Sequence, residues 1–323
     1  MILIFELVID IDKGKRHHSF NILIKEKIED DIISTLFALK FNDFIITGGE
    51  YLNFFKFDYE EKKLTFSFKI SESTKINKII AFNENYIKKS EKIFVCDQNG
   101  FISLYDIHDN KGNLVIYLLF SQKCHKSSID NILYLPEENF LISLCNKDLE
   151  LKFWNINNEG LKSFKNINNY SFNANNNCMI NIKTSIKGKL IGYLLIGAKD
   201  GIQLFKHKNK QIISHNFYKD NDLGEIRTIR YLGNNYFICG RFFGYCSIFL
   251  LRGKNIRKIN SFRNNNSCIF NSFLYDQYHI TDICVKDIND SKKKVNIRYL
   301  IITSADKTVK IYSYDIYEIS NND

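Results

Sequence analysis

Residues 141–155 read LISLCNKDLELKFWN and contain Trp154, the one tryptophan among the 323 residues of the chain. The stretch consists of two short apolar runs separated by a polar turn, and neither run has the 3.6-residue period of an amphipathic helix. Two such runs joined by a tight turn predict a β-hairpin, with Trp154 near the end of its second strand. Whether Trp154 is a buried anchor or a binding residue depends on whether this pattern recurs along the chain.

The pattern does recur, in five further segments. Each has a β run, a tight polar or glycine-containing turn, and a second β run with an aromatic residue near its end. The six aromatic residues are Phe57, Tyr105, Trp154, Phe205, Phe249 and Tyr312. They are spaced by 44 to 63 residues, and each interval holds two more short apolar runs. Four strands per repeat predict an all-β fold, a β-propeller of four-stranded blades.

Two of the repeats resemble the WD40 repeat, which has a His at its start, an Asp in the turn and a Trp near the end of the third strand. The matching positions are His125, Asp148 and Trp154 in one repeat and His279, Asp306 and Tyr312 in the other. In both repeats the Asp precedes the aromatic residue by six positions. The resemblance to the WD40 family covers about residues 32–315 and is only positional in the other four repeats, so the propeller is a divergent one.

The resemblance implies a structural network in the best-matched repeat, running from Asp148 to His125 to Ser143 to Trp154. A buried indole N–H needs an acceptor, and a turn Asp can accept from a His side chain or from backbone amides. The second network would involve His279, Asp306 and Tyr312. Where Phe replaces Trp, the donor is lost and packing alone is expected. Trp154 is therefore interpreted as a structural anchor rather than a binding residue.

Seven blades are predicted, with six as the alternative. The last repeat lacks an outer strand, which one N-terminal segment could supply, and the other N-terminal segment would then be part of a seventh, truncated blade. Apolar segments at residues 2–9 and 19–24 precede the first repeat. The N-terminal strand is expected to close the last blade, and residues 268–277 are expected to belong to a degenerate repeat. The whole chain is predicted to be one domain. Its parts are closing strands in 1–31, repeat units in 32–316 and a tail in 317–323.

Charge and cysteine usage restrict the class of protein. The formal net charge of +9 is spread along the chain and gives only a weak preference for acidic partners. The eight cysteines form no CxxC pair, which favours reduced, buried thiols in the cytoplasm or nucleus over disulfides or zinc ligands. The first ten residues lack the features of a signal peptide. No run of 18 apolar residues exists, so no membrane span is expected.

Motifs for chemistry are missing from the sequence. It has no GxxxxGK[ST] phosphate loop, no HExxH and no GxSxG. The segment DIDKG at Asp10 is similar to the start of a calcium loop, but Asn21 stands where a bidentate Glu is needed. We therefore expect no catalytic residue, no cofactor and no metal, and predict that the chain is not an enzyme.

A non-enzymatic scaffold for an intracellular multiprotein complex is the function that the resemblance implies. Partners would dock on the turns between the second and third strands. Three consecutive repeats carry a cation there, and an arc that docks an acidic segment is proposed from Lys147, Lys199 and Arg241, with Arg227 and Phe242 beside them. The simpler interpretation is that these are scattered surface cations.

Other partners and functions stay open. A partner chain could supply strands to an incomplete blade by edge pairing. An RNA- or ribosome-associated propeller is the first alternative function, because Lys and aromatic residues are interleaved in YLNFFKFD from Tyr51. A propeller enzyme with a site in the central channel is the second alternative. Nucleic acid binding is not favoured, since aromatic residues at period two fit a packed strand.

Overall fold

The structure is a computed structural model of the chain. It describes residues 2–315 apart from 13–14, 27–32, 40–42, 72–73, 83–89, 111–112, 158, 169–177, 187–188, 209–210, 221–223, 264–279, 291–294 and 306–308. The chain divides into two compact units, Met1–Asn166 and Ile167–Asp323, and each unit is described by itself. Within the described residues, no helix is long and apolar enough to cross a membrane.

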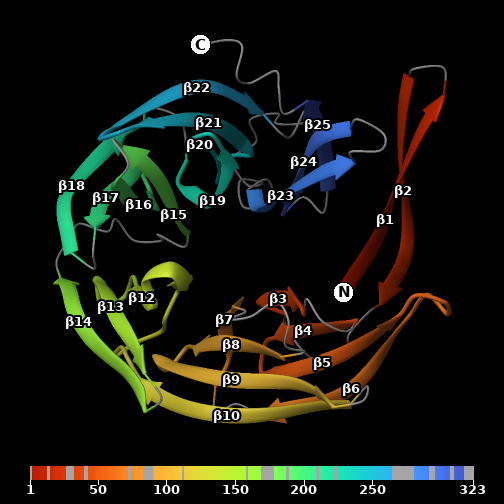
Figure 1. Ribbon diagram of the computed structural model, residues 1–323, viewed down its shortest axis with the longest axis horizontal. Helices are drawn as coiled ribbons and strands as arrows, with labels where there is room; N and C mark the ends of the chain where they lie inside the picture. The colour runs from red at the N-terminus through yellow and green to blue at the C-terminus, as the bar shows by residue number, and fades with distance from the viewer. Residues whose placement is uncertain are drawn as a thin grey trace, which may run out of the picture. The chain divides into compact units, whose positions relative to one another are not determined.

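The first unit contains a two-stranded hairpin and three four-stranded antiparallel sheets, each formed by strands consecutive in the sequence (Figure 1). The hairpin is β1 (Ile2–Asp12) and β2 (Lys15–Glu26). The first sheet is β3 (Thr35–Ala38), β4 (Phe44–Gly48), β5 (Tyr51–Asp58) and β6 (Lys63–Ser71). The second is β7 (Ile76–Phe82), β8 (Ser90–Asp97), β9 (Phe101–Asn110) and β10 (Asn113–Lys123). The third is β11 (Asn131–Leu135), β12 (Phe140–Cys145), β13 (Glu150–Asn157) and β14 (Gly160–Asn168), with a 3-10 turn, Pro136–Glu138, after β11.

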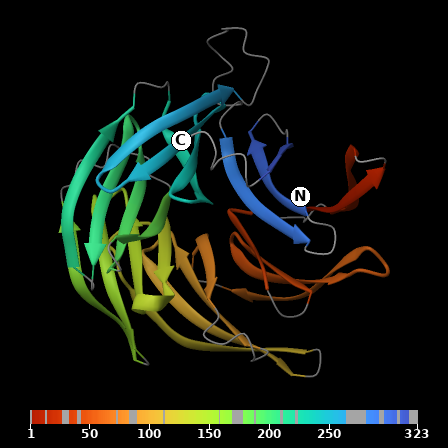
Figure 2. The same cartoon turned by 45° about the horizontal axis from the view of Figure 1, so that its top comes forward.

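The second unit contains two four-stranded sheets and one three-stranded sheet, again in sequence order (Figure 2). The first is β15 (Met179–Ile186), β16 (Lys189–Ala198), β17 (Gly201–Lys208) and β18 (Gln211–Lys219). The second is β19 (Ile226–Gly233), β20 (Tyr236–Arg241), β21 (Tyr245–Arg252) and β22 (Asn255–Arg263). The third is β23 (Ile280–Asp290), β24 (Val295–Ser304) and β25 (Val309–Asp315).

Burial along the strands follows their position in the sheet. All residues of the second strands β12 and β20 are buried, whereas the outer strand β10 has only exposed and half-buried residues. The two buried strands are covered on both faces and are therefore mostly apolar. Successive sheets in each unit share a hydrophobic core: Phe54 of β5 packs in one cluster with Ile79 of β7, and Phe237 of β20 packs in another with Leu195 of β16.

The described residues form six sheets of blade type, and they contain no seventh. This agrees with the six-blade alternative rather than with the favoured count of seven. The predicted closure by the N-terminal strand was wrong, because β1 pairs along its length with β2 and the sheet of β23–β25 has three strands. The expected degenerate repeat at 268–277 lies outside the described residues. The predicted single domain with its closing strands and tail stays a prediction.

Candidate functional site

The best-matched repeat has a buried chain of hydrogen bonds around Trp154. The Trp154 Nε1–H donates to Ser143 Oγ over 2.8 Å, and Ser143 Oγ lies 2.6 Å from His125 Nε2. The other His125 nitrogen, Nδ1, lies 3.2 Å from Glu150 Oε2. All of these residues come from the β11–β14 sheet or the loop that enters it. The side chains of Ser143 and Trp154 lie on neighbouring strands β12 and β13, so the network holds the second and third strands to the loop before β11.

The donor and acceptor roles in this hydrogen-bond network follow from the ionisation of Glu150. Burial acts to raise the pKa of Glu150, but hydrogen bonds and charge interactions with Lys152 and His125 together lower that pKa, so Glu150 is an ionised acceptor. His125 Nδ1 therefore carries the proton, and Nε2 accepts from the Ser143 hydroxyl. Ser143 Oγ in turn accepts from Trp154. Each donor in the network therefore has an acceptor, as a stable buried polar network requires.

Asp148 does not contact His125 in the way that the resemblance implied. Its Oδ2 accepts from the Ser127 amide at 2.9 Å, and its own amide donates to the Cys145 sulfur at 3.4 Å. Glu150 takes the predicted place beside the imidazole. The physical reason is that Asp148 lies in the turn, where the free amides of the loop before β11 are its nearest donors, while Glu150 is the first residue of β13.

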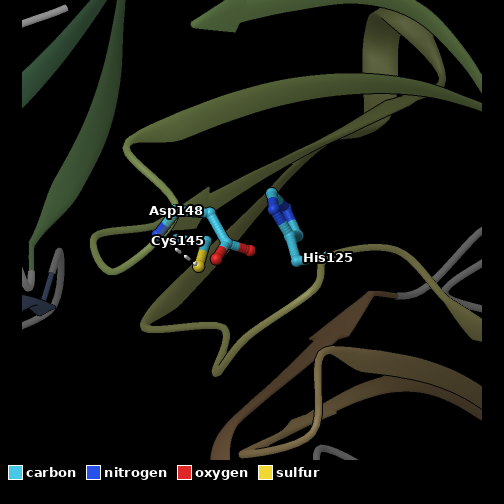
Figure 3. Close-up of side chains that lie close together, drawn as sticks. All are labelled: His125, Cys145 and Asp148. Carbon is cyan, nitrogen blue, oxygen red and sulfur yellow. Dashed lines mark hydrogen bonds between the residues drawn. The ribbon is translucent and has the colours of Figure 1, made fainter. Parts of the chain in front are cut away.

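His125, Cys145 and Asp148 point toward one another, with their ligand atoms all within 4.8 Å (Figure 3). Burial raises the pKa of the Cys145 thiol to about 12. Burial also acts to raise the pKa of Asp148, but hydrogen bonds from Ser127 and the Lys126 amide outweigh it and lower the pKa. Both His125 nitrogens are already engaged. The cluster is therefore organised by internal hydrogen bonds, which a metal ion would have to displace.

The stability of the protein is expected to fall as the pH drops below 6.5. Burial, then the charge of Lys152, lowers the pKa of His125 to about 4, and burial, then Lys183, lowers that of His207 to about 4. Because the unfolded chain binds a proton near pH 6.5, it binds more protons than the folded chain between pH 6.5 and 4. Each histidine should cost about 1 kcal/mol of unfolding free energy between pH 7 and 5.5. Urea titrations at the two pH values would measure the loss, and His125→Gln should reduce it; an unchanged pH slope would contradict the assignment.

The predicted docking arc is wrong in one of its members. Arg241 is fully buried at the end of β20, where it forms an ion pair with Asp220 and donates to Gly224 O at 3.0 Å and Ser247 Oγ at 3.4 Å. A side chain without exposed surface cannot receive a partner. Arg241 instead forms buried contacts that link the residue after β18 to strands β20 and β21.

Arg227 and Phe242 lie together, but both are already engaged within their own sheet. The Arg227 guanidinium lies 5.1 Å from the ring centroid of Phe242 and pairs with Glu225. Phe242 is half-buried and packs edge-on against Phe243 with ring centroids 5.2 Å apart. Lys147 and Lys199, in contrast, are exposed in their turns. The structure therefore leaves these two lysines as the accessible cations of the arc.

The second predicted network is described only in part. His279 and Asp306 lie outside the described residues. Tyr312 is half-buried on β25 and packs edge-on against Phe262, with ring centroids 5.5 Å apart. Burial raises its pKa. The aromatic position is therefore occupied by a packed side chain, and the hydrogen-bonded network of this repeat stays a prediction.

Comparisons with known proteins show the fold. No family model matches the chain, and no curated protein matches it either. Among solved structures, a chain of the mitotic checkpoint complex matches with a TM-score of 0.62 and 12% identity, over 92% of this chain and 78% of that one. Sqt1 of Chaetomium thermophilum, bound to the N-terminus of the ribosomal protein L10, matches with a TM-score of 0.61 and 11% identity, over 97% and 84%. Sqt1 of Saccharomyces cerevisiae gives 0.52 and 11%, over 85% and 83%.

The chain has the fold of a WD40-type β-propeller. The sheets described above are therefore its blades, and the turns between second and third strands, which carry Lys147, Lys199 and Phe242, belong to equivalent places in successive blades. At this level of identity the likeness concerns the fold alone. What the propeller binds must be argued from its own exposed residues.

Sequence reasoning missed two residues of this region. Glu150 was overlooked because the family pattern assigned its role to Asp148, although the sequence places a carboxylate at the start of the third strand. Asp220 was overlooked because it follows a strand in a polar segment and has no motif around it. Its pairing with Arg241 depends on the three-dimensional closeness of two loops, which no local pattern indicates.

Proposed function

We propose that this propeller is a non-enzymatic scaffold that binds acidic segments of partner proteins through the turns between the second and third strands of its blades. The observation that supports this is the exposure of Lys147 and Lys199 in two such turns, where neither forms an ion pair with a described residue. An exposed cation without an internal partner pays little to accept a carboxylate from another chain. Each lysine is proposed to contact a partner from its own blade.

Reversal of both charges is expected to abolish partner capture. The double variant Lys147→Glu, Lys199→Glu should lose a partner that the wild-type protein retains from an extract of the native organism, as measured by affinity purification with mass spectrometry. The melting temperature should stay unchanged, because exposed charges contribute little to folding. Lys162→Glu, on the exposed side of β14, is the matched control. Full capture by the double variant would refute docking through these lysines.

The three-stranded last blade offers a second route to a partner. Among the described strands, β25 is at the edge of its sheet, and we propose that its outer hydrogen-bonding groups pair with a strand from another chain. Edge pairing at β25 is the form in which we keep the predicted pairing of a partner strand with an incomplete blade. It would account for a partner that the charge-reversed double variant still captures. Sqt1, which has the same fold, is bound to the N-terminus of the ribosomal protein L10 in one of the matched structures, and this supports binding of a segment of another protein as a role for the fold.

The state of the cysteines bears on where the protein is located. We propose a cytoplasmic or nuclear location, because the seven described cysteines are free thiols and six are buried.

For RNA binding, the aromatic residues of β5 would have to face solvent, but Phe54, Phe55 and Phe57 are buried. For an enzyme, the cluster of His125, Cys145 and Asp148 is held by its own hydrogen bonds. These contacts of the described residues favour neither RNA binding nor catalysis over the scaffold function.

A further inference from the structure

Leu149 has a backbone conformation that leucine rarely adopts. It lies in the turn between β12 and β13 with φ at +52°, and the residue is 37% exposed. A left-handed conformation brings Cβ close to the following carbonyl oxygen, so it is disfavoured for residues other than Gly, Asn and Asp. More than a third of the residue is left without contact in the blade. The left-handed conformation therefore has a conformational cost while the side chain stays partly exposed.

Two other blades of the chain solve the same turn with glycine. The last residue of each turn donates its amide to the carbonyl three positions earlier: Gly100 to Asp97 at 3.4 Å, Leu149 to Asn146 at 3.2 Å and Gly244 to Arg241 at 3.2 Å. Gly100 and Gly244 have φ of +85° and +76°. These three turns are equivalent, so Leu149 occupies a position that elsewhere carries no side chain.

Leu149 also differs from the other strained positions of the chain. The described residues other than glycine with positive φ are Lys62, Asn139, Leu149, Asn234 and Asn235. Asparagine is the residue that tolerates this conformation best after glycine, and the chain contains 38 asparagines. Leu149 is thus the apolar exception among these described positions. Local rules broken without local compensation are expected at functional sites.

Leu149 lies in a fixed turn, between two carboxylates in the sequence that are engaged within the blade. Asp148 accepts from the Ser127 amide, and Glu150 pairs with Lys152. Lys147 in the same turn and Lys126 in the loop before β11 are exposed and form no ion pair with a described residue. The two segments are held together because the Ser127 amide donates to Asp148 Oδ2. The Asn146 amide donates to Asp130 Oδ2 at 2.7 Å and fixes the start of the turn. A partly exposed apolar side chain is therefore presented by a preorganised turn, and this turn and the loop bonded to it each carry an exposed lysine.

We propose that Leu149, Lys126 and Lys147 form a docking surface for an extended acidic segment that carries an apolar or aromatic side chain. The apolar side chain packs on Leu149, and acidic residues on either side of it meet the two lysines. The charge of the two lysines selects an acidic partner over a basic one, and the fixed turn lowers the entropy cost of binding. This inference rests on the proposed function and names the surface and the partner chemistry within one blade.

Selection from a library tests the chemistry of the partner. A phage-displayed library of random 12-residue peptides, selected on the immobilised wild-type protein, should enrich peptides with acidic residues around an apolar or aromatic one. Enrichment of basic peptides, or of no acidic peptide, would overturn the inference. The strongest acidic peptide then serves as a labelled probe for fluorescence anisotropy.

Leu149→Asn separates docking from folding. The variant should bind the probe about tenfold more weakly, which corresponds to about 1.4 kcal/mol. Its melting temperature should rise by about 2 °C, because Asn relieves the strain. Lys147→Glu and Lys126→Glu should each weaken binding at least as much without changing the melting temperature. Leu36→Asn removes a leucine of β3 that is more exposed than Leu149, 51% against 37%. Lys162→Glu reverses an exposed charge on β14, and both variants should bind the probe like wild type.

The outcomes distinguish this inference from the scaffold function. If Leu149→Asn binds the probe as wild type does, Leu149 is not a docking residue and the inference fails. If Leu149→Asn also retains every partner that the wild-type protein captures from the native extract, the scaffold function survives while the surface is wrong. If the wild-type protein captures no reproducible partner from that extract, the proposed function itself fails.

Discussion

Replacement of Trp154 by alanine is expected to lower the free energy of unfolding by about 3 to 5 kcal/mol, the range for truncation of a large buried aromatic side chain. Trp154 is only 5% exposed and lies in a core shared by the β7–β10 and β11–β14 blades. The truncation removes this packing and also leaves Ser143 Oγ without its indole donor. Chemical denaturation followed by far-ultraviolet circular dichroism would measure the loss.

Trp154→Phe is the control that divides packing from hydrogen bonding. It keeps a ring in the core and deletes the N–H, so it should cost about 1 to 2 kcal/mol, the net value of one buried hydrogen bond with a partner left unsatisfied. Phe205 and Phe249, like Trp154, lie opposite an apolar residue of the second strand in two other blades, and both are buried. An alanine variant that melts like wild type but loses its partner would show that Trp154 is a binding residue instead.

The fold was predictable because the propeller repeats its pattern. Each repeat has a tight turn between two β runs and an aromatic residue near the end of the second run, so the sequence indicated that Trp154 is one of six repeated aromatic residues rather than a unique one. The number of blades was not predictable from the same signals. Apolar runs such as residues 2–9 indicate a strand, but they do not say which edge it pairs with, since pairing between segments far apart in the sequence leaves no local pattern.

The candidate site was predictable only where neighbours in sequence determine geometry. The hydrogen bonds among His125, Ser143 and Trp154 follow the repeat, because the two strands that carry Ser143 and Trp154 pair across one tight turn. The choice of Glu150 over Asp148 depends on distances of a few ångströms within the turn. The burial of Arg241 depends on Asp220, which lies 21 positions earlier, and sequence alone gave Arg241 the same standing as the exposed Lys147.

Removal of the Asp220 carboxylate is the second change with a large expected effect. The Arg241 side chain has no exposed surface and that of Asp220 is 4% exposed. Asp220→Ala would leave the guanidinium charge buried without its carboxylate partner, and such broken pairs typically cost about 3 to 5 kcal/mol. Lys258 Nζ lies 3.7 Å from Asp220 Oδ1 and would lose a partner as well. Thermal and urea unfolding of the variant would measure the effect.

A double-variant cycle shows whether the cost comes from the unpaired charge. If it does, Asp220→Ala combined with Arg241→Met should be more stable than Asp220→Ala alone, because methionine fills much of the space and leaves no buried cation. If the two losses simply add, the pair contributes through packing and through the bonds of Arg241 to Gly224 and Ser247 instead. A cost below about 1 kcal/mol for Asp220→Ala would mean that Arg241 can turn toward solvent. That result would return Arg241 to the set of cations available to a partner, so the same experiment decides between a buried structural residue and a docking residue.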